Sequence, residues 1–138
     1  MTIESCHPDS HFNEGLAAAA CAKNITDEQL SELKETLDLQ EFYIARGNVD
    51  NIRIMDSRFH ELVYRMSGSG VLYDTLLPLH KKVQKFRKAS VENADRASQS
   101  AREHRAIYEA IAARNPDLAE RCTYEHIANA AAHIKIKL

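Results

Sequence analysis

The apolar residues of this chain recur every three or four positions along most of its length, which is the spacing of amphipathic helices. The pattern is clearest over residues 26–46, with Leu30, Leu33, Leu37 and Ile44, and over residues 48–66, with Ile52, Met55, Phe59, Leu62, Val63 and Met66. No stretch alternates convincingly between apolar and polar residues, as a half-buried strand would. The pattern therefore predicts an all-α fold.

Helix caps and breaks divide this pattern into about six helices. Thr26 and Gln29 have the spacing of a capping box, and Gly47 suits the C-terminal end of the same helix. The Ser-Gly-Ser-Gly run at 67–70 and the Asn-Pro pair at 115–116 mark two further breaks. We expect helices over about residues 15–23, 26–46, 48–66, 71–90, 93–114 and 116–134. Long helices with short connections predict an antiparallel bundle.

The chain length fits a single domain. Its 138 residues are enough to bury a core without disulfides. Residues 1–14 are polar, contain Pro8 and are expected to be poorly ordered, whereas residues 15–138 are expected to form the helical domain. The Ala-rich segment 15–23 permits close packing against another helix, and the basic stretch 80–88 (HKKVQKFRK) is expected to be a solvated helix face.

Composition and charge exclude several classes of protein. The hydrophobic fraction of 44% and the charged fraction of 28% are ordinary for a globular protein. A net charge of -2 gives this chain alone no electrostatic basis for binding nucleic acid. No apolar run approaches the roughly 20 residues of a membrane span, and the N-terminus lacks the pattern of a signal peptide. Three cysteines without a CxxC pair indicate reduced thiols and a cytoplasmic location.

One predicted helix carries a carboxylate and an imidazole on the same face. Asp56 and His60 stand four residues apart. On a helical wheel Asp56 lies about 40° from Ile52, at the edge of the apolar stripe. A bare carboxylate in that position is costly unless it is paired or bound to a metal. The alternative is that Asp56 acts as a cap or pairs with Arg53.

Two further helices each carry a histidine on an apolar face. His104 shares its face with Ile107 and Ile111, and His126 shares its face with small residues. Three imidazoles and one carboxylate would suit Zn, Ni, Fe, Mn or Co and leave one or two positions open for water or a ligand. Taken singly, each histidine is more simply a hydrogen-bonded core residue, so the prediction depends on the conjunction. His133, one heptad after His126, is an alternative ligand.

These residues also resemble a known family. The segments LAAAACAKNITDEQL, MDSRFHELVYRMSGSG and AREHRAIYEAIAARNPDLAERCTYEHI are similar to the FCD domain, the C-terminal effector domain of the FadR subfamily of GntR transcription regulators. The similarity covers about residues 14–134. Its most specific parts are the Asp-x-x-x-His at 56–60, the Glu-His at 103–104 before an Ile-x-x-Ala-Ile run, and the His-Ile at 126–127.

The resemblance implies a helical bundle that forms homodimers and senses a ligand. It assigns a divalent metal to Asp56, His60, His104 and His126, with Zn as our first expectation and Ni, Mn or Fe as alternatives. Family members bind a small carboxylate or sugar acid beside the metal, or acyl-CoA in a branch without metal, and the three histidines favour the metal branch. A small acid fits because a cation with an open position takes an oxygen ligand.

The sequence departs from the family pattern in three places. Family members read DNA through an N-terminal winged helix-turn-helix, for which there is no room before Gly15, so we expect no DNA binding by this chain alone. Many relatives have a ligand-binding arginine on the first helix, whereas the first arginine here is Arg46. An asparagine that often follows the third helix is replaced around Ser69 and Gly70.

Three side chains are weaker candidates for holding the effector. Arg53 lies about 20° from His60 on the helical wheel. Arg96 and Ser100 precede His104 within two turns on roughly its face. The alternative is that both arginines are solvated surface charges and that Ser100 is a small packing residue.

The leading interpretation is an effector-sensing, dimerising domain of a transcription regulator that is not an enzyme. A small metal-dependent hydrolase or lyase is a second interpretation, because a metal with an open position activates water. It would need a general base, and Glu103 points about 100° away from His104 on the wheel. A structural oligomerisation bundle with buried histidines is the third.

Overall fold

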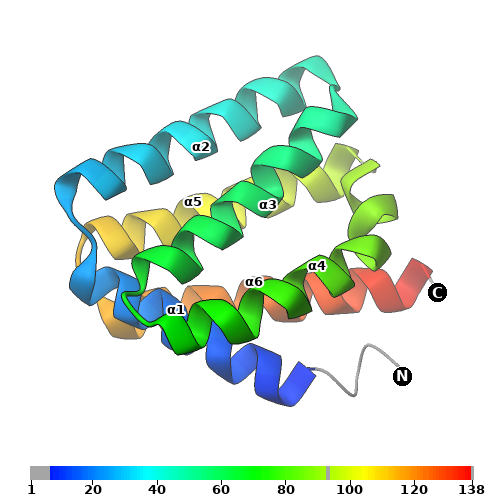
Figure 1. The fold of residues 1–138 in the computed structure, drawn as a ribbon. Coiled ribbons are helices and arrows are strands. Elements are labelled where there is room, and N and C mark those ends of the chain that lie inside the picture. Colours follow the sequence, from blue (N-terminus) through cyan, green and yellow to red (C-terminus); the bar gives the residue numbers. More distant parts are fainter. Residues whose placement is uncertain (1–6, 93, 138) are drawn as a thin grey trace.

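Six helices form the structure, and no strand occurs among the described residues (Figure 1). The computed structural model describes the backbone of residues 7–92 and 94–137, and the side chains of residues 12–84 and 94–132. The helices are α1 His7–Asn24, α2 Asp27–Arg46, α3 Val49–Met66, α4 Gly70–Glu92, α5 Ala94–Ala112 and α6 Pro116–Lys137. The predicted all-α fold is confirmed. None of the described helices combines the length and the apolar composition that crossing a membrane would require.

The helix ends follow the caps expected from the sequence. Thr26 and Gln29 form both hydrogen bonds of a capping box at the start of α2. Gly47 ends this helix with a φ of 67°, a left-handed conformation that glycine adopts without steric strain. The side chain of Asn48 caps α3, and the side chain of Asn115 caps α6. Local polar groups therefore set the lengths of the helices that carry the site.

The first helix begins earlier than the sequence indicates. Residues 7–14, expected to be poorly ordered, form the first turns of α1, and residues 1–6 lie outside the described residues. Two contacts near this end explain the difference. Glu14 is buried and accepts a hydrogen bond from the Tyr64 hydroxyl of α3. A Cβ at Gly15 would lie only 3.0 Å from side-chain atoms of α6, so the absence of a side chain lets α1 and α6 pack closely.

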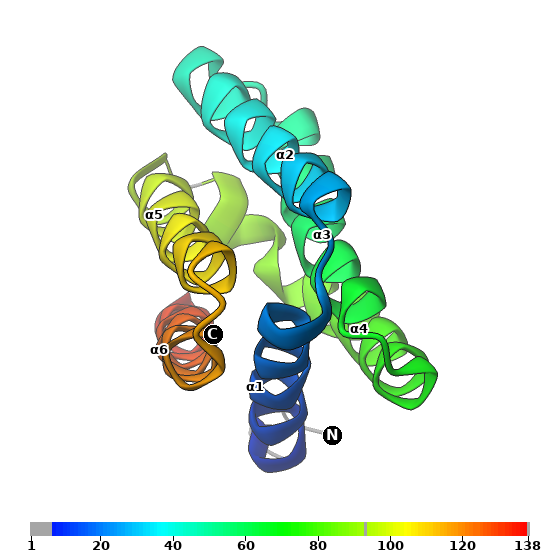
Figure 2. The ribbon, with the colours of Figure 1, turned by 90° about the vertical axis from the view of Figure 1, so that its left-hand side faces the viewer.

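The helices enclose an apolar core that continues into a polar layer. In Figure 2, α5 and α6 lie on one side, α2, α3 and α4 lie on the other, and α1 lies between the two groups. The core is built from α1, α2, α3, α5 and α6; its buried members are Ala18, Cys21, Ala22, Ile25, Leu33, Leu37, Phe59, Leu62, Val63, Met66, Ile107, Ala110, Ile111 and Ala119. The buried histidines precede the core residues on α5 and follow them on α6, since these two helices run in opposite directions.

Candidate metal centre

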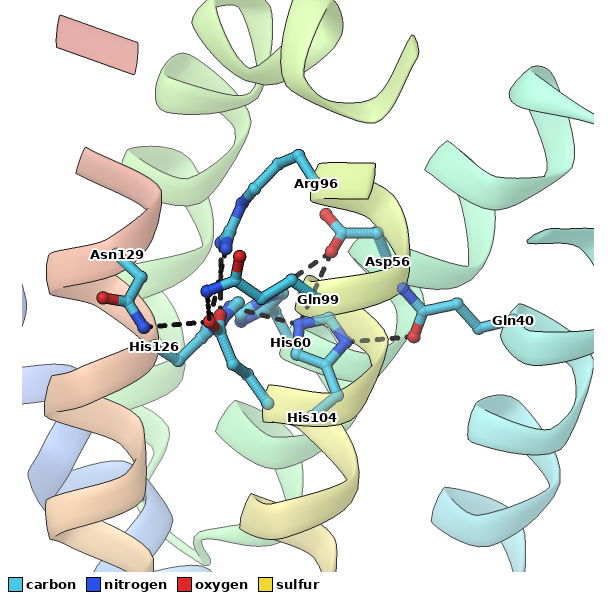
Figure 3. A network of polar contacts seen from close by, with 9 residues as sticks. Gln40, Asp56, His60, Arg96, Gln99, His104, His126 and Asn129 are labelled. Carbon is cyan, nitrogen blue, oxygen red and sulfur yellow. Dashed lines mark hydrogen bonds and ion pairs between the residues drawn. The ribbon is translucent and has the colours of Figure 1, made fainter. Parts of the chain in front are cut away.

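Four buried side chains from three helices converge in the polar layer (Figure 3). Asp56 and His60 come from α3, His104 from α5 and His126 from α6, and each is at most 5% exposed. One ligand atom of each imidazole lies within 4.8 Å of those of the other two. Asp56 Oδ1 lies 3.5 Å from His104 Nε2 and 3.9 Å from His60 Nε2. The structure thus brings together all four expected ligands; the side chain of His133 lies outside the described residues.

The spacing of two of these donor atoms is that of ligands to a single metal ion. Two nitrogens bound to one tetrahedral zinc, each at about 2.0–2.1 Å, lie about 3.3 Å from each other. The Nε2 atoms of His104 and His126 are 3.1 Å apart. Neutral imidazole and carboxylate are donors that suit Zn, Ni, Fe and Mn. The residues present therefore fit the metal that the sequence implies.

Hydrogen bonds on the far side of two rings determine which nitrogen carries the proton. His104 Nδ1–H donates to Gln40 Oε1 on α2 at 3.0 Å, and His126 Nδ1–H donates to Glu103 Oε1 at 2.6 Å. In the neutral rings both Nε2 atoms are then acceptors whose lone pairs face each other. Two such acceptors 3.1 Å apart repel each other unless a cation, either a metal ion or an added proton, lies between them. Metal-bound histidines usually make such outer hydrogen bonds, which orient the ring and fix its tautomer.

Glu103 holds His126 from outside the ligand set and is itself held by three side chains. Both terminal nitrogens of Arg96 donate to its carboxylate, at 3.2 and 3.3 Å, and Gln99 and Asn129 each donate at 2.9 Å (Figure 3). Burial alone would raise the pKa of Glu103, but in the metal-free protein the hydrogen bond from His126 and the charge of this ring when it is protonated, with the hydrogen bonds from Arg96 and Asn129, lower it to about 2. Glu103 therefore stays ionised as the acceptor that positions His126.

One residue of the basic stretch is buried, contrary to the expected solvated face. His80 is 6% exposed, and its ring centroid lies 4.8 Å from that of His60. The reason is helical periodicity, because His80 follows the buried Leu76 by four residues and shares its inward face. Lys81 and Lys82 are exposed, as expected.

The three expected effector residues lie in different surroundings. Arg96 is buried against Glu103, so its guanidinium supports the ligand His126 through that carboxylate. Ser100 is also buried. Arg53 pairs with a neighbouring aspartate and lines an open groove with residues of α3 and α4. Effector binding by these three residues stays a prediction.

A small cavity borders His60. Its volume is about 10 Å³, which is room for about one water molecule. Its other polar linings are Glu14 of α1, Tyr64 of α3 and Thr123 of α6. Any organic ligand that enters here requires the surrounding side chains to move apart.

Two residues that hydrogen-bond the expected ligands were not predicted from the sequence. Gln40 is 1% exposed and follows Leu33 and Leu37 on the apolar face of α2, so a polar residue on that face was the available signal. Glu103 does point away from the face of His104, as the wheel indicates, but it points toward α6. Its partner could not be identified without knowing which helix lies alongside.

Comparison with known proteins agrees with the resemblance noted in the sequence. The chain matches the FCD domain family over residues 14–129. It is 27% identical over 114 residues to the HTH-type transcriptional repressor RspR of Escherichia coli (strain K12), a match that covers 83% of this chain and 50% of RspR. An uncharacterized HTH-type transcriptional regulator, YdfH of Shigella flexneri, matches with the same values. The chain thus spans about half the length of these curated relatives.

Solved structures show the same fold. McbR/YncC of E. coli superposes with a TM-score of 0.88 at 18% identity, covering 98% of this chain and 65% of that one. GntR of Streptococcus agalactiae superposes with a TM-score of 0.74 at 24% identity, covering 86% and 52%. Since the family match includes all four converging side chains and most of the chain, this protein belongs to the FCD domain family.

Proposed function

We propose that this chain is the effector-sensing domain of a transcription regulator, in which a divalent metal on Asp56, His60, His104 and His126 receives a small organic acid. The names of the curated relatives, which are HTH-type regulators, support the regulatory role. In this proposal DNA contact belongs to a winged helix-turn-helix, in the half of the relatives' length that the chain does not match. The proposed role implies a cytoplasmic location and no catalysis.

The main support for this proposal is that the Nε2 atoms of His104 and His126, both acceptors in the neutral rings, face each other. His104 and His126 each donate through Nδ1 and present Nε2 to each other at 3.1 Å, with Asp56 Oδ1 3.5 Å from His104 Nε2. A dication placed among these atoms would relieve the repulsion between the lone pairs. Zn is our first choice, with Ni, Mn or Fe as alternatives. When bound, the metal supplies an electrophilic centre with an open position for a carboxylate or sugar-acid oxygen.

Sensing follows from the position of the ligands on different helices. The four side chains belong to α3, α5 and α6, and Gln40 joins α2 to the same group. Because the cavity beside His60 holds about one water, an acid that binds there must move apart side chains of α1, α3, α5 and α6, and we propose that these helices shift with them. In a homodimeric regulator such a displacement would change the spacing of the DNA-reading parts.

Calorimetry tests both halves of the proposal. Small hydroxy acids, dicarboxylates, amino acids and sugar acids are titrated into metal-loaded protein and into protein stripped by a chelator. We expect at least one acid to bind the loaded form and to lose its binding after stripping. Equal binding after stripping would contradict the role of the metal, and binding of no acid would contradict the role of the effector.

A metal-dependent hydrolase is less compatible with the site. The carboxylate next to the ligand set, Glu103, is fixed by Arg96 and His126 and so does not serve as a mobile general base. Turnover of simple esters or lactones by the metal-loaded protein would overturn this view.

A further inference from the structure

An open groove runs along the outer side of α3 and α4. Its volume is about 1090 Å³, which is enough for a small organic ligand. Ile54, which lines the groove, precedes His60 by six residues, so the two side chains point about 120° apart around α3. None of the four proposed metal ligands is among the described residues that line the groove. The groove is therefore a separate place from the metal centre.

Arg53 has an unused hydrogen-bond donor at this groove. Its Nε atom is buried and has no hydrogen-bond partner among the described residues. Its Nη2 atom donates to Asp50 Oδ1 at 3.1 Å, and the Asp50 side chain is 86% exposed. Nε and Nη2 form one edge of the guanidinium, which matches the two oxygens of a carboxylate. Because so exposed an ion pair contributes little, a carboxylate that accepts from both atoms would replace Asp50.

The other side chains of the groove suit an anion that has an apolar body. Lys81 is exposed and makes no ion pair within the described part of the chain, so its charge is available to a ligand. The carboxylate of Glu61 is already paired with Arg65 at 3.5 Å. Ile54 is 55% exposed and Met55 lines the same groove, so an apolar group placed against them would be removed from water.

We propose that this groove binds a carboxylic acid with an apolar body, at a site independent of the metal centre. The carboxylate accepts hydrogen bonds from Nε and Nη2 of Arg53, and Lys81 adds attraction for the anion. The apolar body covers Ile54 and Met55. Binding supplies an acceptor to the buried Nε atom, and an unsatisfied buried donor is costly. A short acid or an uncharged apolar molecule makes only one part of these contacts.

Three small probes separate the two parts of the ligand. Phenylacetate, acetate and 2-phenylethanol are titrated into zinc-loaded protein, and amide chemical shifts in NMR spectra report both the affinity and the location. We expect phenylacetate to bind at least about tenfold more tightly than either of the others, because only phenylacetate has both the charge and the apolar ring. The shifted amides should lie in residues 50–61 of α3 and around Lys81 of α4.

Two arginines of α3 provide a matched comparison. Arg65 also pairs with an acidic residue of its own helix, but it is not among the described residues that line the groove. Arg53→Gln should weaken phenylacetate binding at least about tenfold, as the loss of a charge-assisted hydrogen bond predicts, whereas Arg65→Gln should leave it unchanged. Arg53→Lys keeps the charge without the two-donor edge, so it should also weaken binding. Circular dichroism checks each fold, and Arg53→Lys replaces Arg53→Gln if the latter does not fold.

The outcomes distinguish this site from the metal centre. Phenylacetate binding that persists in His104→Ala and after removal of zinc, but weakens in Arg53→Gln, supports the groove site. Binding that disappears with zinc, that is equal in Arg53→Gln and the wild type, or that acetate or 2-phenylethanol matches would overturn the groove site and leave the metal and acid site standing. Absence of phenylacetate binding would overturn it too, whereas failure to bind zinc would overturn only the metal centre.

Discussion

Gln40 Oε1 accepts a hydrogen bond from His104 Nδ1 at 3.0 Å, across 64 positions of sequence. This contact connects α2, which contributes no ligand, to the ligand of α5. It lies fully inside the bundle, since Gln40 is 1% and His104 0% exposed. A buried amide in this position fixes both the rotation and the tautomer of the ring.

Removing this amide should weaken metal binding. In Gln40→Leu the His104 ring loses its anchor, and we expect the metal affinity to fall about 10–100-fold. Competition with a chromophoric chelator measures the change. Thr36→Val is the control on the same helix, because the buried Thr36 hydroxyl bonds only the Glu32 carbonyl of its own helix in the contacts described. Wild-type affinity in Gln40→Leu would show that the contact does not orient the ligand.

The Glu103 carboxylate should make the free energy of unfolding fall as the pH is lowered below 4.5. Its pKa in the folded state is about 2, below its ordinary value of 4.5. The carboxylate therefore stabilises the fold fully above pH 4.5, and this contribution is lost as the pH falls toward 2. Urea unfolding of metal-free protein between these two pH values should show a steeper loss of unfolding free energy in the wild type than in Glu103→Gln. Parallel curves would contradict the inferred pairing with His126.

The two cysteines in the described part of the chain should differ in reactivity. Burial raises the pKa of Cys21 to about 12, and Cys21 is 0% exposed, whereas Cys122 is only partly buried. At pH 8 an alkylating reagent should modify Cys122 well before Cys21, because the thiolate is the nucleophile. Peptide mapping by mass spectrometry measures the order, with Cys122→Ala as the control. Early labelling of Cys21 would mean that this core opens readily.

The raised pKa of Cys21 also predicts that the protein loses stability at alkaline pH. A thiol whose folded pKa lies above its ordinary value of 9.0 contributes stability that is complete below pH 9.0 and lost as the pH rises toward 12. The wild type should therefore lose unfolding free energy faster than Cys21→Ala over this range. Denaturant titrations at each pH measure the unfolding free energy. If it falls equally with pH in the wild type and in Cys21→Ala, the thiol is not buried as described.

Gly47 tests the structure independently of the site. Its φ of 67° is strained for any residue with a side chain, and no heavy atom lies within 4 Å of an added Cβ. Gly47→Ala should therefore cost about 1 kcal/mol of unfolding free energy through the backbone alone. Urea denaturation measures this, and metal content should stay as in the wild type. A neutral effect would mean that α2 does not end here in solution.

Local signals made much of the fold predictable, and together with the family resemblance they identified the four converging residues. The caps at Thr26 and Gly47 depend only on neighbouring residues, and they lie where the sequence indicates. Asp56 and His60 were recognisable because a four-residue spacing and an apolar face are properties of one helix. The burial of His80 was also predictable, because it follows Leu76 by four residues and so lies on the same helix face. The neighbouring lysines led instead to the expectation of a solvated face.

Contacts between helices could not be predicted from a single sequence. Gln40 and Glu103 support their histidines from α2 and across to α6, and such pairs depend on how each helix is rotated in the bundle. Glu14 lies in a polar segment with no apolar periodicity, so nothing in its surroundings indicated burial. It becomes buried because α1 packs against α3 and α6.

Metal content tests the central claim most directly. Protein purified without a histidine tag is analysed by elemental analysis and native mass spectrometry, beside His104→Ala and the control Ile107→Ala, which removes a buried side chain one turn away on the same helix. We expect one divalent metal per chain in the wild type and in Ile107→Ala, and none in His104→Ala. A wild type without stoichiometric metal under metal-replete conditions, or a His104→Ala variant that keeps it, would contradict the metal centre.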